Sequence, residues 1–353
     1  MTYPTDLPAL PPQPAGVAWP TKGWPEGPLP AQADNAKLDA LLDHAFSAVA
    51  PDDLDETHAL VIVQGGKLIK ERYWTGFGPE VTCPSWSKAK SITQALVGIA
   101  VKDGKIDIQA PADVPEWHET AGDPRAVITL DQLLRMSSGL AFREDYVDGE
   151  ASDVIEMLFG KGQDDIGHFA ASLPLAHAPG TFWAYSSGTT NIIARALQKA
   201  LGLKGSDFEA FMRTRLLDVI GMTSAAPKFD KAGTFVGSSF CYATPRDFAK
   251  FGLLYLRDGM WEGTRLLPEG WVDYARTPTW QQEGEARDTP YSAQWWLGMG
   301  GAGSFSANGY QGQFTVCIPD LDMVIVRHGK TDAAKGPEVK AWIKAISDCF
   351  RTK

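Results

Sequence analysis

The sequence predicts an α+β fold with one antiparallel sheet, because strand signals gather near both ends of the chain and helical signals fill the middle. β-rich runs stand at 58–74 and return from 293 to 329, whereas short helical segments and loops occupy 106–230. The economical arrangement is a single antiparallel sheet built from both chain ends, covered by terminal helices, with a mostly helical insertion. A length of 353 residues fits two domains or one domain with a large insertion.

The N-terminal part combines a proline-rich arm, a helix and a hairpin. Trp19 and Trp24 favour an extended arm that packs along the body, with a disordered tail as the alternative. Apolar residues recur at helical spacing over 35–49 and predict a helix. Two β-rich runs flank the Gly-Gly pair at 65–66 and predict a hairpin. A helix over 91–104 follows and ends at a glycine.

The C-terminal part completes the predicted sheet. Strands are expected within 293–300, 304–319 and 321–329, and an amphipathic helix over 336–352 closes the chain. The predicted division is an extended arm at 1–34, a sheet domain from 35–105 and 231–353, a helical domain at 106–230, and an active site between the two domains.

Composition points to an ordinary globular protein that handles small molecules. The net charge of -10, without a basic cluster, argues against nucleic-acid binding. The four cysteines form no CxxC pair, which favours free thiols in a reducing compartment. The N-terminus lacks the pattern of a secretory signal, and no apolar run reaches about 18 residues, so we expect a cytoplasmic protein without a membrane span.

Several common catalytic patterns are absent from the sequence. The zinc motif HExxH, the phosphate loop GxxxxGK[ST], the dinucleotide fingerprint GxGxxG and the nucleophile elbow GxSxG do not occur in the required contexts. A zinc hydrolase, a nucleotide-binding enzyme and an α/β-hydrolase are therefore not expected.

Two overlapping serine–lysine pairs stand in the segment PSWSKAKS: Ser85 with Lys88, and Ser87 with Lys90. Pro84 and the small polar residues can open a helix, and residues three apart then lie on one helix face, so hydroxyl and ammonium come within reach. A serine at a helix start also offers its own N–H to an oxyanion, and the helix dipole lowers the pKa of a nearby lysine. Because Ser85 suits an N-cap, we favour Ser87 as nucleophile beside Lys90.

Three blocks in order resemble the serine β-lactamase-like hydrolases, which include class C β-lactamases, family VIII carboxylesterases and 6-aminohexanoate-dimer hydrolases. The block WSKAKSITQALVGIAVKDGKID is similar to the nucleophile helix and puts Ser87 and Lys90 in the SxxK places. The block PGTFWAYSSGTTNIIARAL resembles the tyrosine motif, which implies Tyr185 as base and places Ser187 where β-lactamases carry the Asn of Tyr-x-Asn. The resemblance runs from roughly residue 35 to the end and implies the β-lactamase/transpeptidase-like fold.

The third block, NGYQGQFTVCIPDLDMVIV, is similar to the strand that carries Lys-Thr-Gly or His-x-Gly in relatives and reads Tyr310-Gln311-Gly312 here. The resemblance implies an oxyanion site between the N–H of Ser87 and that of Gln313 on the edge strand. It also implies that Gly312 lets the backbone approach the substrate closely.

The mechanism implied by the resemblance passes through an acyl-enzyme and needs no metal or cofactor. Ser87 attacks a carbonyl carbon. The positive charge of Lys90 favours tyrosinate, so Tyr185 accepts the proton of Ser87 and passes it to the leaving group. Water then hydrolyses the ester intermediate.

Further residues of these blocks are candidates for the substrate cleft. Asp145 and Tyr146 either line the cleft or cap a loop, and Trp183 stands beside the expected base, with a core aromatic pair as the alternative. Trp295 and Trp296 alternate in a strand, so one should face the core and the other the opposite side, where it would wall the acyl pocket.

Departures from the β-lactamase pattern direct the expected substrate away from β-lactams. Tyr310 replaces the lysine that helps to hold the β-lactam carboxylate, and Ser187 replaces an asparagine. We therefore expect a serine hydrolase for carboxylic esters or small linear amides. A β-lactamase, a D-amino-acid peptidase and a non-catalytic penicillin-binding-like module are the alternatives. The oligomeric state stays open, with a homodimer among the alternatives.

Overall fold

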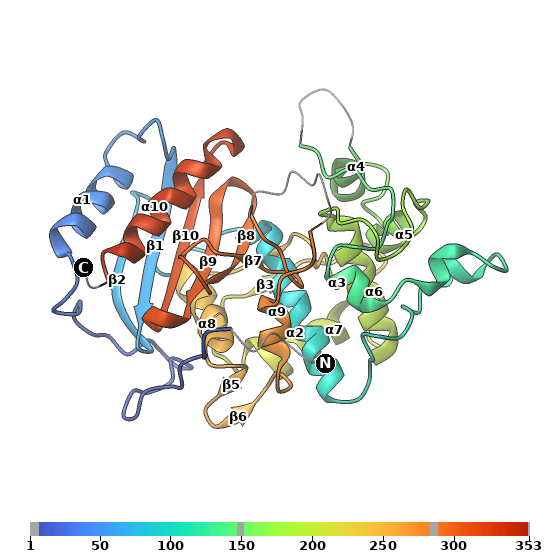
Figure 1. The fold of residues 1–353 in the computed structure, drawn as a ribbon, viewed down its shortest axis with the longest axis horizontal. Helices are drawn as coiled ribbons and strands as arrows, with labels where there is room; N and C mark the ends of the chain where they lie inside the picture. Colours follow the sequence, from blue (N-terminus) through green and yellow to red (C-terminus); the bar gives the residue numbers. More distant parts are fainter. Residues whose placement is uncertain (1–6, 147–151, 282–288, 352–353) are drawn as a thin grey trace.

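The computed structural model describes residues 7–146, 152–281 and 289–351, and its centre is an antiparallel sheet (Figure 1). Within these residues the sheet has six strands in the order β2-β1-β10-β9-β8-β7. Their bounds are β1 (Glu56–Gln64), β2 (Lys67–Tyr73), β7 (Trp296–Leu297), β8 (Phe305–Gly309), β9 (Gln313–Ile318) and β10 (Met323–Lys330). The N-terminal hairpin joins the C-terminal strands through the antiparallel pair β1–β10, so the predicted α+β fold with a sheet from both chain ends is confirmed.

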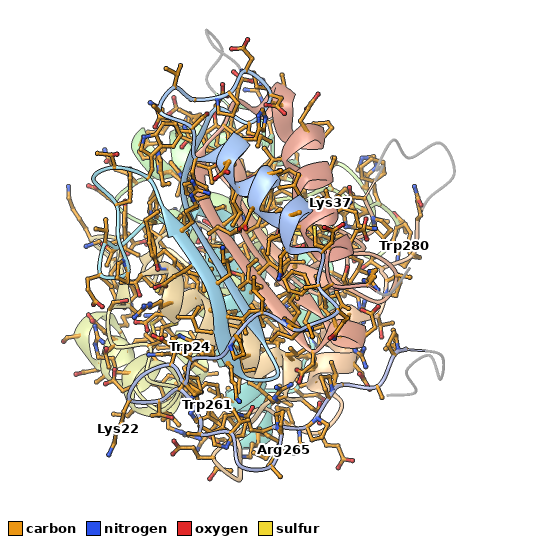
Figure 2. All side chains as sticks on the ribbon, turned by 90° about the vertical axis from the view of Figure 1, so that its left-hand side faces the viewer. Lys22, Trp24, Lys37, Trp261, Arg265 and Trp280 are labelled. Carbon is orange, nitrogen blue, oxygen red and sulfur yellow. The ribbon has the colours of Figure 1, made fainter. Side chains whose placement is uncertain are left out.

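The sheet separates two apolar layers because side chains alternate along its strands. On β1, Leu60 and Ile62 pack toward one layer, whereas Val61 and Val63 pack toward the other. Two terminal helices cover the first layer and lie side by side across the sheet in Figures 1 and 2: α1 (Asn35–Ala45) and α10 (Gly336–Asp348).

The second face of the sheet packs against α8, and α2 and the helices of the middle of the chain continue this layer away from α1 and α10 (Figure 1). The helices on this side are α2 (Ala89–Lys102), α3 (Leu130–Leu134), α4 (Asp153–Phe159), α5 (Ile166–Ala171), α6 (Ser187–Leu201), α7 (Gly205–Met212), α8 (Pro245–Leu256) and α9 (Trp271–Arg276).

Short elements connect these helices and strands. The 3-10 turns are η1 (Trp86–Lys88), η2 (Pro115–His118), η3 (Pro124–Val127), η5 (Tyr310–Gly312), η6 (Pro319–Leu321) and η7 (Ala333–Lys335), and η4 (Arg213–Leu217) is a π-helical turn. Two small ribbons pair β3 (Ala226–Pro227) with β4 (Cys241–Tyr242), and β5 (Met260–Trp261) with β6 (Thr264–Arg265). No helix within the described ranges is both long and apolar enough to cross a bilayer.

The tryptophans of the N-terminal arm pack against the body. The ring of Trp19 lies 4.9 Å from that of Trp261, and the indole N–H of Trp24 donates to the carbonyl of Arg246 at 3.1 Å. Figure 2 labels Trp24 and Trp261 at the same end of the strands. The aromatic contacts fix the path of this proline-rich segment, which has little secondary structure of its own.

The strand prediction near the C-terminus differs from the structure in its boundaries. The segment 293–300 contributes only the two-residue strand β7, and the segment 304–319 divides into β8 and β9 around the turn η5. Gln311 has a φ of 61°, so the chain reverses direction there and the two halves pair with each other.

Candidate active site

Ser87 lies in the turn η1, which leads directly into helix α2. Trp86 has a φ of 45°, a conformation that is costly for a bulky residue. The helix therefore begins after this turn and not at Pro84. Ser87 is half-buried and lines a cavity of about 230 Å³, so its hydroxyl is accessible to a small substrate.

The two serine–lysine pairs of the sequence have different surroundings. The ammonium of Lys90 donates to the hydroxyl of Ser87 at 3.0 Å. The hydroxyl of Ser85 is buried: it donates to the carbonyl of Ser239 and accepts from the N–H of Cys241, both at 2.9 Å. Ser85 thus anchors the turn, and the geometry supports the preference for Ser87.

Lys88 points away from both serines into the core. Its ammonium lies 3.1 Å from Nε2 of His328 and 3.3 Å from the ring centroid of Phe248. Nδ1 of His328 in turn lies 3.0 Å from Oε1 of Gln313. Burial lowers the pKa of Lys88 well below its usual range. Lys88 is therefore part of a buried polar chain behind the nucleophile turn.

Lys90 is held by three oxygen atoms. Besides the hydroxyl of Ser87, its ammonium donates to the hydroxyl of Ser187 at 2.9 Å and to the carbonyl of Ser238 at 3.1 Å. Burial lowers the pKa of Lys90 to about 8, and the negative charge of Glu144 opposes this shift. A substantial fraction of Lys90 is therefore neutral near pH 8 and able to accept a proton from Ser87.

Tyr185 lies against this pair and is expected to stay protonated. Its ring centroid is 4.8 Å from the ammonium of Lys90, and it lines the cavity together with Ser87. Burial, and then the charge of Glu144, raise the pKa of Tyr185, whereas the nearby hydroxyl of Ser87 lowers it less. The sequence led us to expect tyrosinate. These surroundings favour the neutral phenol, because a buried phenolate close to a carboxylate is poorly stabilised.

Glu144 joins the site through Ser187, the first residue of α6. The backbone N–H and the hydroxyl of Ser187 both donate to the Glu144 carboxylate at 2.6 Å. Tyr146 adds a hydroxyl at 3.3 Å. Ser187 therefore bridges Lys90 and Glu144, and the carboxylate lies at the positive end of a helix dipole.

Aromatic side chains form most of the cavity wall. The rings of Tyr146 and Tyr310 stack with centroids 5.0 Å apart. Trp296 lines the cavity, whereas Trp295 is 0 % exposed and faces the core, which confirms the alternation predicted for this pair. Trp183 packs behind Trp296 at 6.4 Å and does not itself line the cavity. The described lining residues are Ser87, Glu144, Tyr146, Tyr185, Trp296, Asn308, Gly309, Tyr310, Phe314 and Lys340.

The residues expected from the third block are displaced from the cavity. Strand β9, which begins at Gln313, is an inner strand of the sheet, and the side chain of Gln313 is buried against His328 and Gly329. Gly312 faces the guanidinium of Arg327, where a Cβ would lie 2.1 Å from Nη1. Neither Gly312 nor Gln313 is among the described residues that line the cavity. The structure therefore does not bring these two residues to the cavity that Ser87 lines.

The end of β8 takes the place beside the nucleophile instead. A Cβ on Gly309 would lie 2.4 Å from the carbonyl oxygen of Ser85, so only glycine allows this close approach. Gly309 and the next residue, Tyr310, both line the cavity with Ser87. Tyr310 is thus the part of the predicted Tyr310-Gln311-Gly312 motif that reaches the site.

Comparison with known proteins agrees with this arrangement. The pattern of the Beta-lactamase family matches residues 53–346. The chain belongs to the beta-lactamase family. Within that family it is 27% identical over 303 residues to the 6-aminohexanoate-dimer hydrolase of Paenarthrobacter ureafaciens, an alignment that covers 81% of this chain and 75% of the relative.

Solved structures support the beta-lactamase-type fold. A Bacillus anthracis protein provisionally named 6-aminohexanoate-dimer hydrolase superposes with a TM-score of 0.71 at 22% identity, covering 94% of this chain and 87% of the other. A family VIII carboxylesterase superposes with a TM-score of 0.67 at 14% identity, covering 92% and 99%. At these identities the likeness establishes the fold.

Sequence reasoning missed several residues of this beta-lactamase-family site. It singled out Asp145, which is exposed and does not line the cavity, whereas the neighbouring Glu144 does. It also missed Gly309 and Lys340. The acidic pair in REDY and the first glycine of NGYQG were signals in the sequence, but Lys340 carried none. Within the described ranges, no group of three or more His, Cys, Asp or Glu residues is arranged to hold a metal ion.

Proposed function

We propose that this protein is a serine hydrolase that cleaves carboxylic esters or small linear amides through an acyl-enzyme. The observation that carries the proposal is the 3.0 Å hydrogen bond between Lys90 and the accessible hydroxyl of Ser87. A lysine whose pKa is lowered to about 8 can act as a general base near neutral pH. The cavity of about 230 Å³ is smaller than the roughly 300–1,000 Å³ of drug-sized ligand sites, which favours small substrates.

The proposed reaction begins when neutral Lys90 accepts the proton of Ser87 as its oxygen attacks the carbonyl carbon. The carbon–oxygen bond to Ser87 forms, and the bond to the leaving group breaks as Tyr185, a neutral phenol, donates a proton to that group. The proton on Lys90 then restores the phenol. Water, deprotonated by Lys90, attacks the acyl-enzyme, and the proton returns to Ser87 as the carboxylic acid leaves.

We further propose that the oxyanion lies between the backbone N–H of Ser87 and that of Tyr310. The support is the close approach of Gly309 to the nucleophile turn, which brings the end of β8 to the cavity wall beside Ser87. Backbone donors in a half-enclosed site stabilise the developing negative charge without reorganisation. This replaces Gln313 in the expected pair.

The proposal includes both esters and amides as substrates because of the relatives of this chain. One homologue is named for the hydrolysis of the 6-aminohexanoate dimer, and one structural neighbour is a carboxylesterase. The same nucleophile and base serve both reactions, since the two differ chiefly in the proton that the leaving group needs. We therefore propose the shared acyl-transfer step as the function.

The deciding experiment is intact-mass labelling of the wild type with a fluorophosphonate, together with turnover of p-nitrophenyl butyrate. We expect one adduct on the wild type, none on Ser87→Ala, and one on Ser85→Ala. Ser85→Ala should label although it loses about 1–3 kcal/mol of stability, because two buried backbone groups lose their partner. Labelling of Ser87→Ala, or none on the wild type, would refute the proposal, the latter in favour of a non-catalytic module.

Replacing Glu144 by Gln should move the rising part of the pH–activity profile to lower pH. The carboxylate raises the pKa of Lys90, so loss of its charge leaves Lys90 neutral at lower pH. We also expect kcat/KM at the optimum to fall about tenfold, because Ser187 loses charge-assisted hydrogen bonds. The control is Asp145→Asn, an exposed neighbour that should change neither quantity. A shift to higher pH would contradict the assigned charge effect.

A further inference from the structure

A continuous row of aromatic rings leads from the candidate active-site cavity to helix α4. The ring centroid of Tyr310, which lines the cavity, lies 5.5 Å from that of Trp86. The ring of Trp86 lies 5.6 Å from that of Phe240, and the ring of Phe240 lies 6.2 Å from that of Phe159, the last residue of α4. We call these four residues the aromatic track. They come from four separate segments of the chain, so the row exists only in the folded molecule.

The aromatic track is partly in contact with solvent. Phe159 is 53 % exposed, and Tyr310, Trp86 and Phe240 are half-buried. A single exposed phenylalanine is ordinary on a protein surface, whereas a connected apolar strip is typical of a binding site. The track therefore leaves apolar surface exposed that is continuous with the wall of the cavity.

Trp86 occupies its place in the track at an energetic cost. Its φ of 45° is unfavourable for a bulky residue, and its indole N–H is buried with no acceptor among the residues that the structure describes. The side chain is only half-buried, so packing in the core does not offset this cost in full. Strained residues of this kind gather at functional sites, and Trp86 directly precedes the nucleophile.

The proposed proton donor assigns the two halves of a substrate to different walls. Tyr185, which donates to the leaving group in the proposed reaction, has its ring centroid 5.7 Å from that of Tyr291 and 5.5 Å from that of Trp296. Neither of these two partners belongs to the track. The leaving group is therefore expected beside Trp296, and the acyl group on the side of Tyr310 and Trp86.

We infer that the aromatic track binds the acyl chain of the substrate, so that the enzyme prefers aliphatic acyl groups longer than the cavity can hold. This inference rests on the proposed function and narrows its substrate class. A cavity of about 230 Å³ holds the reacting carbonyl and a short stretch of chain, and the track continues from its wall. Neighbouring rings of the track are inclined by 84°, 52° and 59°. They offer no common face to a flat aromatic ligand, whereas a flexible alkyl chain can follow them.

The test compares acyl chains of different length on one leaving group. We expect the wild type to turn over p-nitrophenyl decanoate with a kcat/KM about tenfold higher than that of p-nitrophenyl butyrate, because the additional methylene groups leave water on the track. Phe159→Gln should lower this decanoate-to-butyrate ratio to about threefold, since it replaces apolar surface at the far end of the track. The loss should appear mainly as a higher KM for the decanoate, because the contact exists before and during the reaction. Phe159 is the exposed end of α4, so this variant should fold like the wild type.

Phe182→Gln is the matched control, because Phe182 is also an exposed phenylalanine but lies outside the track, stacked on His177. It should leave the decanoate-to-butyrate ratio unchanged. The inference is overturned if the wild type does not favour the decanoate, or if Phe159→Gln retains the wild-type ratio. A preference for hexyl acetate over ethyl acetate that Phe159→Gln removes would overturn the assignment of the track to the acyl side. Failure of the proposed function gives a different result: no ester is turned over and Ser87 is not labelled.

Binding provides a second readout that does not depend on turnover. Calorimetric titration of Ser87→Ala with N-methyldecanamide should show an affinity about threefold higher than titration of the double variant Ser87→Ala, Phe159→Gln. N-methylbutanamide, whose chain is too short to reach Phe159, should bind both variants equally. Equal binding of N-methyldecanamide to the two variants would overturn the role of the aromatic track whether or not the protein is a hydrolase.

Discussion

Lys90→Met is expected to lower kcat/KM for p-nitrophenyl esters about a thousandfold, the size typical of the loss of a general base. Methionine keeps the apolar stem but cannot accept the proton of Ser87, which lies 3.0 Å from the ammonium in the native site. The loss should fall on kcat, because the interaction acts in the transition state. Steady-state kinetics and the rate of fluorophosphonate labelling both measure it.

The pKa of Lys90 also predicts the direction in which kcat/KM changes with pH. Burial lowers the pKa of Lys90 to about 8, so the reactive neutral form grows as pH rises and kcat/KM should increase to a plateau above pH 8. A protonated Lys90 also lowers the free energy of unfolding, because its charge is buried in the folded state. This destabilisation is largest below about pH 8 and decreases as the pH rises toward 10.5, the pKa of an unperturbed lysine. Lys90→Met should lose the rising limb and still melt cooperatively.

Lys88→Met is the matched control for Lys90→Met. Lys88 is equally buried and only two positions away, but its ammonium contacts His328 and the face of Phe248. We expect Lys88→Met to keep activity within about tenfold of the wild type, since its partners lie behind the turn and not in the cavity. If Lys88→Met abolished turnover and Lys90→Met did not, the assignment of the reactive pair would be wrong.

The fold was predictable where the local sequence pattern of a segment agrees with the strand pairing seen in the structure. The Gly-Gly turn at 65–66 joins β1 and β2 as expected, and β1 pairs with β10 near the other chain end. The Ser87–Lys90 spacing was also readable, because a turn entering a helix places these side chains together whatever the remainder of the chain does.

The remainder of the site depends on contacts between distant segments, which spacing alone does not encode. The segment NGYQG contains two glycines, and only the packing of β8 against Ser85 decides that Gly309 and not Gly312 faces the nucleophile. The choice between Glu144 and Asp145 is similar. It depends on the N-terminus of α6, which lies 43 residues further along the chain at Ser187. Lys340 comes from a terminal helix whose apolar pattern indicates only how it covers the sheet.

Arg327→Met is expected to destabilise the protein by about 4 kcal/mol or more, the largest stability effect we predict. Arg327 is 0 % exposed and its guanidinium is bound by oxygen atoms from several segments of the chain. Nη1 donates to the carbonyls of Gln311 at 3.2 Å and Gly312 at 3.0 Å. Nη2 donates to the carbonyls of Leu54 at 3.3 Å and Glu56 at 3.1 Å, and to the hydroxyls of Thr57 at 3.0 Å and Thr331 at 2.7 Å.

Methionine fills much of the same volume but donates to none of these oxygens. Each buried acceptor left without a partner costs about 1–3 kcal/mol, and several are lost together. Lysine in this position would not restore them, because one ammonium cannot span the two sides of the planar guanidinium. A loss of this size is a large share of the roughly 5–15 kcal/mol that stabilises a typical domain.

Urea unfolding followed by circular dichroism measures the change in the free energy of unfolding. The control is Lys330→Met, at an exposed position three residues further along β10, which should stay within about 0.5 kcal/mol of the wild type. The carbonyls of Gln311 and Gly312 belong to the turn that follows Tyr310, so Arg327→Met should also reduce turnover in protein that remains folded. A loss below about 1.5 kcal/mol would show that water or a rearranged turn replaces the guanidinium. If the folded variant kept full activity, the turn that Arg327 holds would not be needed to position the proposed oxyanion donor, the backbone N–H of Tyr310.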